Sequence, residues 1–160
     1  MFERILVCLD GSELAEEILP LAEQQAGCFH SAVTLFQAIN GPVQVVPATA
    51  LEAGMLIPPS GPEIALVLKE TQEIREQAKV YLEQKAAELL QKGIKADFFV
   101  AEGSAGETIL DYAEKNAIDL IALATHGRSS VGRALFGSVA DHVLKNAVAP
   151  ILIIRPRAGK

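Results

Sequence analysis

Short, unbroken apolar runs alternate along the chain with longer segments in which apolar residues recur every three or four positions. The short runs are typical of strands buried on both faces, and the periodic segments are typical of helices with one buried face. Strands are predicted at Arg4–Leu9, Ala32–Ile39, Ala96–Val100, Leu120–Ala124 and Pro150–Ile154. Alternating strands and helices of these lengths predict a three-layer α/β sandwich, with a five-stranded parallel sheet and helices on both faces.

The first predicted helix follows a polar turn at the end of the first strand. Asp10 or Ser12 is a candidate N-cap, and Glu13 stands at capping-box spacing from Asp10. Because proline lacks a backbone donor, we expect a kink at Pro20. Gly27 is the expected end of this helix.

A long helix is predicted over Glu63–Lys92, where apolar residues repeat at helical spacing up to a stop at Gly93. The segment before it, residues 40–62, is rich in Pro, Gly, Ala and Val. It is too long for a plain connection. We therefore expect a single domain over residues 1–160, with a long loop insertion at 40–62 that acts as a mobile cover or a partner surface.

Two further helices carry candidate N-terminal capping boxes. Ser104 and Glu107 have that spacing before one helix, and Ser138 and Asp141 have it within the next, predicted over Gly137–Asn146. In open parallel sheets, ligands bind beyond the carboxyl ends of the strands, where the strand order reverses. That rule directs attention to the segments after the first, second and fourth strands.

Composition narrows the functional classes. The formal net charge of −6 argues against non-specific nucleic-acid binding, which needs Lys and Arg at the phosphates. The apolar stretches are shorter than the roughly 20 residues needed to span a bilayer, and the early apolar run is too short for a signal peptide. The two cysteines, Cys8 and Cys28, define no disulfide framework and fit a cytoplasmic setting as reduced thiols.

The strongest chemical signal is the segment Thr125–Val139, THGRSSVGRALFGSV, which follows a strand and leads into a helix. Glycine lets backbone amides approach a ligand closely, and a helix N-terminus favours anions. The segment is either a phosphate-binding loop or a plain surface loop, and Ser138 is either a ligand contact or a helix cap. Asp10 has the same two interpretations, as a ligand contact or as an N-cap.

Several more specific chemistries are excluded by the residues present. Gly127 and Gly132 have P-loop spacing, but Arg133 and Ala134 stand where a P-loop has Lys and Ser or Thr. No G-x-G-x-x-G motif follows the first strand. Cys28 and His30 lack the further ligands that a metal site needs, so no protein-held metal is predicted. No residue pattern resembles a nucleophile or a general base for water attack, so no catalytic residue is assigned.

The chain resembles the universal stress protein family of the ATP-binding-motif type. The family signature is G-x2-G-x9-G-[ST] after the fourth strand, and Gly127 and Gly137-Ser138 have the required spacing, with Ala124 in place of the first glycine. ILVCLDGSELAE at the start, EGSAGETILDYAEKNAIDLIALATHGRSS in the middle and GSVADHVLKNAVAPILIIRP at the end also resemble the family. The resemblance implies the strand order 3-2-1-4-5.

The resemblance also implies a set of nucleotide contacts. Asp10 would contact the adenosine part, Leu9 and Ala38 would lie near the base, and His126 would line the loop. The backbone of the loop and the serine hydroxyl would face the phosphates. The implied nucleotide-binding residues are Leu9, Asp10, Ala38, Ala124, His126, Gly127, Arg128, Gly137, Ser138 and Val139.

The expected function is that of a cytoplasmic stress-response protein, not an enzyme, that binds ATP or AMP and signals through a nucleotide-dependent change in shape or partner. Mg or Mn would be held by the phosphates. The alternative is a nucleotide-independent dimeric interaction protein whose loop binds only small anions; slow ATP hydrolysis ranks last. A homodimer through strand 150–154 is expected, because an apolar edge strand invites pairing and the resemblance implies it. The protein partner is unknown.

Overall fold

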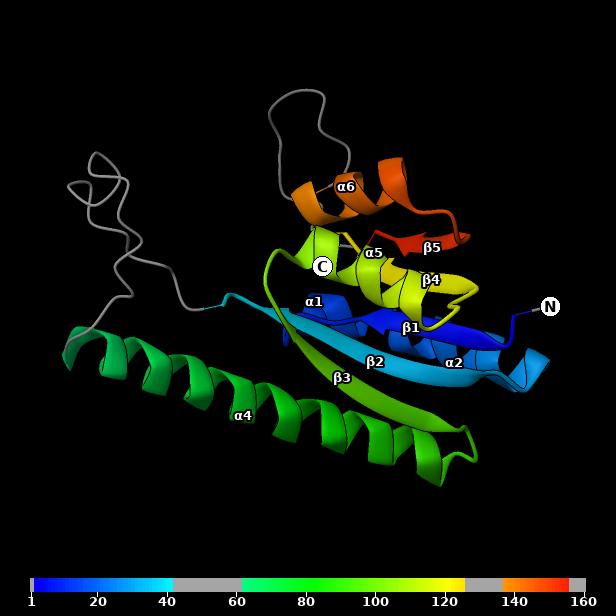
Figure 1. Cartoon of the computed structure of the whole chain (residues 1–160). Coiled ribbons are helices and arrows are strands. Elements are labelled where there is room, and N and C mark those ends of the chain that lie inside the picture. Colours follow the sequence, from blue (N-terminus) through cyan, green and yellow to red (C-terminus); the bar gives the residue numbers. More distant parts are fainter. Residues whose placement is uncertain (1, 42–61, 126–136, 156–160) are drawn as a thin grey trace, which may run out of the picture.

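The computed structural model describes residues 2–41, 62–125 and 137–155. Five parallel strands form one sheet in the order β3-β2-β1-β4-β5, which confirms the predicted fold class and strand order (Figure 1). The strands are β1 (Arg4–Cys8), β2 (Ala32–Ile39), β3 (Ala96–Glu102), β4 (Leu120–Ala124) and β5 (Ile151–Ile154). The helices are α1 (Glu13–Glu16), α2 (Leu19–Phe29), α4 (Pro62–Gln91), α5 (Ala105–Lys115) and α6 (Ser138–Asn146).

The side chains of the sheet divide into two apolar layers. One layer packs against α1, α2 and α4, and in it Val7 and Leu35 of the sheet meet Leu82 of α4. The other packs against α5 and α6, and includes Leu6 and Ile121. The strand interiors are apolar because both faces of the sheet are covered, as expected for a parallel sheet with crossover helices. None of the described helices combines the length and apolar character needed to cross a membrane.

The first predicted helix is wrong in its continuity and its end. Two helices, α1 and α2, take its place, and Pro20 lies at the start of α2. The missing donor of a proline costs nothing in the first helical turn, so Pro20 starts a helix instead of kinking one. Gly27 does not end α2, which continues to Phe29 and closes at His30 in the left-handed conformation (φ 56°).

The predicted capping boxes are not formed. Ser104 is the N-cap of α5, but its side chain makes no capping hydrogen bond. Ser138 is the first residue of α6, and Gly137 is its N-cap. At α1 the cap is Ser12, whose hydroxyl accepts a hydrogen bond from the N–H of Ala15. The long helix α4 does end as expected, because Gly93 adopts φ 79° and its N–H donates to Leu90 O.

The two edges of the sheet are protected differently. In the parallel ladder the N–H of Gly103 donates to Ile39 O, which places the odd-numbered amides of β3 toward β2 and the N–H of Phe98 outward. The carboxylate of Asp97 accepts this outward N–H at 2.7 Å. On β5 the corresponding outward amides belong to Ile151 and Ile153, and no described side chain accepts from them. Of the outward amides of β3, only that of Phe98 has a described side-chain acceptor, so both edges keep outward amides without one among the described residues.

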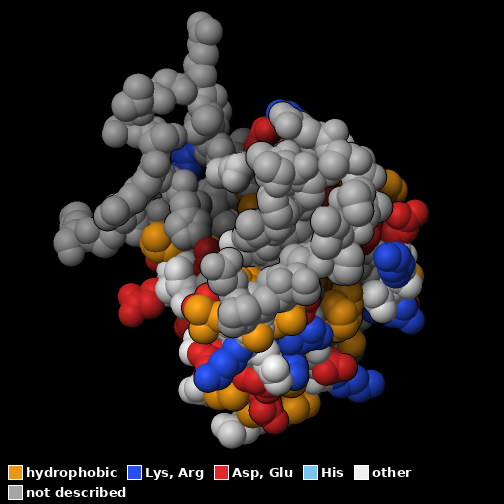
Figure 2. Space-filling model, turned by 60° about the vertical axis from the view of Figure 1, so that its left-hand side comes forward, with side chains coloured by type: hydrophobic (Ala, Val, Ile, Leu, Met, Phe, Trp, Pro, Cys, Tyr) orange, Lys and Arg blue, Asp and Glu red, His pale blue; other side chains and the backbone are white. Residues whose placement is uncertain are grey.

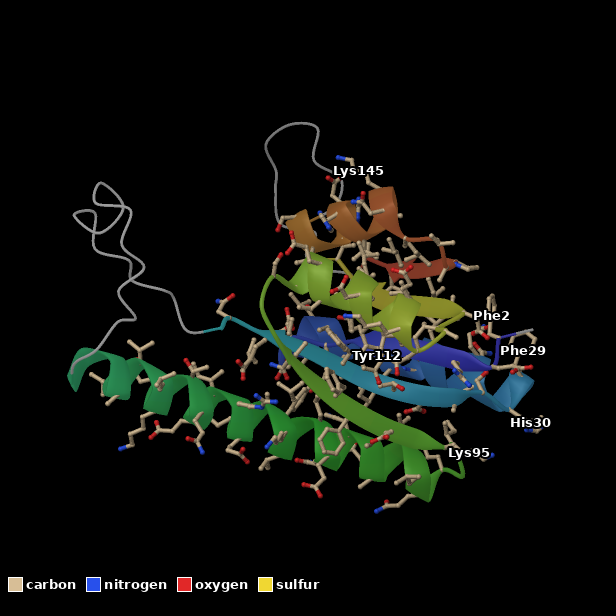
Figure 3. The ribbon with its side chains drawn as sticks, in the orientation of Figure 1. Phe2, Phe29, His30, Lys95, Tyr112 and Lys145 are labelled. Carbon is tan, nitrogen blue, oxygen red and sulfur yellow. The ribbon has the colours of Figure 1, made fainter. Side chains whose placement is uncertain are left out.

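The two ends of the sheet also differ. At the N-terminal end of the strands, Phe2 and Phe29 pack edge to face, with ring centroids 5.7 Å apart, and close the core (Figure 3). The opposite end, where the strands finish, holds the turn after β1 and the start of α6 (Figure 1).

A candidate nucleotide site at the switch point of the sheet

A cavity of about 330 Å³ lies at the carboxyl ends of β1 and β4. The first crossovers run to β2 and β3 on one side of β1, and later ones run to β4 and β5 on the other, so this is where the strand order reverses. Such a switch point is the usual ligand site of an open α/β sheet. The cavity lining comprises Cys8, Leu9, Asp10, Ala15, Phe36, Ala38, Ala105, Ile109, Leu123, Ala124, Thr125, Gly137, Ser138, Val139 and Ala140.

Seven of the ten residues predicted from the sequence are brought together around this cavity. They are Leu9, Asp10, Ala38, Ala124, Gly137, Ser138 and Val139. The other three, His126, Gly127 and Arg128, lie outside the described residues, as does most of the insertion predicted at 40–62. The contact of each residue with a nucleotide stays a prediction.

The turn after β1 is built around the carboxylate of Asp10. It accepts hydrogen bonds from the N–H of Ser12 at 2.9 Å and from the Ser12 hydroxyl at 2.6 Å. Gly11 between them adopts φ 81°, a conformation that favours glycine. Asp10 is therefore not the N-cap of α1; it orients the serine that is, and it stays exposed at the cavity.

The short helix α1 is fixed to the long helix α4 by a cluster around Glu16. Its carboxylate accepts hydrogen bonds from the Tyr81 hydroxyl at 3.1 Å and from the Lys85 ammonium at 2.7 Å. The hydrogen bond to Glu16 is the main cause of the raised pKa of Lys85. Burial, followed by the hydrogen bond to Glu16, raises the pKa of Tyr81. This cluster holds α1, and with it the turn that carries Asp10, against the sheet.

The start of α6 presents backbone donors to the cavity. Gly137 is the N-cap, and no described side chain caps the helix there. The first N–H groups of an α-helix have no partner within the helix, and they lie at the positive end of its dipole. Asp141 in the first turn is an unfavourable charge for an anion, but its carboxylate pairs with the ammonium of Lys145 at 2.6 Å, and Lys145 lies on the outer side of the helix (Figure 3). The arrangement suits a phosphate group.

The floor of the cavity is apolar. Phe36 and Leu123 are buried and pack in the layer beneath α5 and α6, beside Ile109. Cys8 also lines the cavity, and burial raises the pKa of its thiol to about 12, so the thiol stays protonated at neutral pH. Such a floor accepts a flat, weakly polar ring, while the polar groups lie at the rim.

Sequence reasoning missed the floor residues and Thr125. Cys8 and Phe36 belong to strands whose successive side chains point to opposite layers of the sheet. Because Cys8 is two residues after Leu6, it lies on the same side as Leu6, which is the side of the cavity. Thr125 is 2% exposed and follows β4 directly. The signal that could have identified Thr125 was a polar residue directly after a buried strand, at a position that faces the protein interior.

Charge outside the cavity is mixed. On the face shown in Figure 2, the described Lys and Arg side chains are interspersed with Asp and Glu and form no extended basic patch. Among the described residues, no group of three or more His, Cys, Asp or Glu side chains is placed to hold a metal ion.

The fold and the cavity define a doubly wound α/β protein with a candidate ligand site at its switch point. The model of the universal stress protein family matches residues 1–155, and the chain belongs to that family. Universal stress protein MJ0531 of Methanocaldococcus jannaschii is 31% identical over 156 residues, covering 97% of this chain and 83% of that protein.

Solved structures of the family share the fold. Universal stress protein UspA from Lactobacillus plantarum superimposes with a TM-score of 0.74 at 22% identity, covering 96% of this chain and 98% of that one. The universal stress protein from Archaeoglobus fulgidus in complex with dAMP gives a TM-score of 0.59 at 17% identity, covering 96% and 98% of the two chains.

Proposed function

We propose that this stress protein binds an adenine nucleotide, ATP or AMP, in the cavity between β1 and β4. The base would lie on the apolar floor near Leu9 and Ala38, Asp10 would contact the ribose, and the phosphates would face the start of α6 at Gly137, Ser138 and Val139. The observation that carries the proposal is the convergence of these residues, distant in sequence, on one cavity. The complex of the Archaeoglobus fulgidus relative with dAMP supports the same ligand class.

The bound nucleotide would act as a signal and not as a substrate. Burial keeps the Cys8 thiol protonated and unsuited to nucleophilic attack. Besides the Cys8 thiol, the described polar side chains that line the cavity are a carboxylate and two hydroxyls, from Asp10, Thr125 and Ser138. Mg or Mn would accompany the phosphates of ATP and keep most of its ligands from them and from water, as Mg²⁺ usually does.

The test is mass spectrometry of the purified protein after denaturation, followed by calorimetry of the nucleotide-free protein with AMP and ATP. An adenine nucleotide released on denaturation, together with saturable binding, is the expected result. A protein that carries no nucleotide and binds neither ligand would instead support the nucleotide-independent interaction protein.

Restoring glycine at position 124 is expected to tighten binding. Ala124 lines the cavity, and it replaces the first glycine of the family signature. Its side chain also packs against the core layer beneath α1, α2 and α4, so Ala124→Gly should lower the free energy of unfolding by about 0.5–1 kcal/mol. Calorimetry with AMP and a thermal melt separate the two effects. Unchanged or weaker affinity would show that Ala124 does not limit binding.

A homodimer through β5 is the second part of the proposal. The four residues of β5 are apolar and half-buried, and the outward amides of this strand have no described acceptor. Antiparallel pairing of two copies about a two-fold axis would satisfy both edges.

Leu152→Lys is expected to convert the dimer to a monomer in sedimentation at micromolar concentration, because it places a charge beside the contact. Leu152 also packs against the core, so a melt must show that the variant folds. Phe98→Lys, on the opposite edge strand β3, is the matched control and should leave the dimer intact. Wild-type protein that sediments as a monomer would contradict the prediction.

A further inference from the structure

The hydroxyl of Thr125 is a buried polar group without a hydrogen-bond partner among the described residues. The residue is 2% exposed, and its Oγ1 atom has no hydrogen-bond partner among the described residues. Its backbone is satisfied, because the Thr125 N–H donates to Ile154 O at 2.9 Å and so extends the ladder between β4 and β5. The group that lacks a described hydrogen-bond partner is therefore the hydroxyl and not the backbone N–H.

The position of Thr125 directs this hydroxyl to the candidate site. Along β4, Ile121 and Leu123 belong to the layer beneath α5 and α6, and Thr125 continues the same alternation. It lines the cavity together with Ser138 and Ala140 of the first turn of α6. The side-chain oxygen of Gln37 also lacks a described partner, but Gln37 does not line this cavity.

A buried hydroxyl without a partner destabilises the protein, whereas the same hydroxyl stabilises a complex in which a ligand supplies the partner. A threonine hydroxyl has one proton to donate, and hydrogen bonds to charged acceptors are stronger than those to neutral ones. The neighbouring amides of α6 have no side-chain cap among the described residues and also favour an anion. A threonine hydroxyl and the backbone amides at the start of α6 are therefore both available as donors in the same part of the cavity.

We propose that the Thr125 hydroxyl donates a hydrogen bond to a phosphate oxygen of the bound nucleotide and so distinguishes nucleotides from nucleosides. This inference rests on the proposed function and adds a residue that falls between the defined positions of the glycine signature. The ligand class is an adenosine phosphate, with the phosphate nearest the ribose at the start of α6.

The test is the isosteric substitution Thr125→Val in the full chain, stripped of nucleotide by dialysis. Two effects of opposite sign are expected. The melting temperature of the ligand-free protein rises by about 2–4 °C, because an unpaired buried hydroxyl is removed. The affinity for AMP falls about tenfold, the loss of about 1.4 kcal/mol, while the affinity for adenosine is unchanged. Thr125→Ser keeps the donor and should retain most of the AMP affinity.

Thr71→Val is the matched control. The Thr71 hydroxyl already donates to Val67 O at 2.9 Å in α4, away from the cavity, so this variant should not gain stability and should bind AMP like the wild type. A lower melting temperature for Thr125→Val would show that the hydroxyl has a partner in the free protein and would overturn the inference. Unchanged AMP affinity, or an equal loss for adenosine, would overturn it too. A wild-type protein that binds neither ligand would overturn the proposed function itself, a result distinct from these.

Discussion

Gly137→Val is expected to reduce the affinity for AMP by about 100-fold or more while the domain stays folded. Gly137 is the N-cap of α6 and lines the cavity, so a valine side chain would stand where the phosphate is proposed to meet the amides of Ser138 and Val139. Loss of two hydrogen bonds to a charged group, each worth about 1.5–3 kcal/mol, accounts for an effect of this size.

The fold should tolerate this substitution. The backbone of Gly137 has φ −65° and ψ 164°, which any residue adopts, and an added Cβ would meet no described atom within 4 Å. The cost of losing a glycine N-cap is expected to stay near 1 kcal/mol. Gly27→Val is the matched control, since Gly27 lies in α2 outside the cavity and its Cβ would also meet nothing. Calorimetry that gave Gly137→Val wild-type affinity would remove the start of α6 from the binding site.

Gly106→Ala is expected to lower the free energy of unfolding by about 1–3 kcal/mol and to weaken AMP binding. Gly106 lies in the first turn of α5, where an added Cβ would stand 2.7 Å from Cδ2 and 3.1 Å from Cβ of His142 in α6. The contact includes the Cβ atom of His142, whose position does not change with the side-chain rotamer, so a change of rotamer alone does not relieve it. The two helices must separate, and α6 carries the donors of the candidate site.

Denaturant unfolding checks the stability change, and calorimetry checks the binding. Gly27→Ala supplies the comparison, because its added methyl group is unopposed and should be neutral or stabilising by up to about 1 kcal/mol. In the double variant Gly106→Ala/His142→Ala the contacts with Cδ2 and Cγ are gone and only the contact with Cβ at 3.1 Å remains, so part of both losses should be recovered. If Gly106→Ala matches the wild type in both measurements, the close packing of α5 on α6 does not determine the position of α6.

The strands could be predicted from the sequence almost to the residue, and the helix ends could not. β2 and β4 have the predicted bounds because a strand buried on both faces is a continuous apolar run with polar ends. Around Pro20 the pattern of apolar residues is the same for one kinked helix as for two short ones. The outcome depends on the contacts of α1 with the sheet and with α4, which no local pattern contains.

The predicted side-chain caps at Ser104 and Ser138 were wrong for a related reason. Ser104 and Ser138 have the right neighbours in sequence, but a cap also needs the serine in the extended conformation just before the helix and with its hydroxyl turned to the amides. Ser138 is instead the first helical residue, one position too late. The absence of a serine cap favours the ligand interpretation, because the amides that it would have satisfied have no acceptor among the described side chains.

The proximity of the candidate site residues was more predictable than the helix ends and caps. The ends of parallel strands meet at one edge of a sheet, so residues just after β1, β2 and β4 must lie near each other once the order is known. The glycine signature added α6. The apolar floor and Thr125 depend on which side of the sheet each residue faces. In strands buried on both sides, no alternation of polar and apolar residues shows which side that is, so it can be assigned only by counting in steps of two from a residue whose side is known.

The carboxylate of Asp97 has a consequence for assembly. It occupies the outward amide of Phe98 on β3, whereas the outward amides of β5 have no described acceptor. A sheet with two receptive edges would add copies without end and grow into a filament. Two copies that joined through β5 about a two-fold axis would leave the two β3 edges facing outward, and on each of them the amide of Phe98 would already be occupied. The carboxylate of Asp97 would therefore disfavour further pairing at β3, although it would not touch the contact between the two copies.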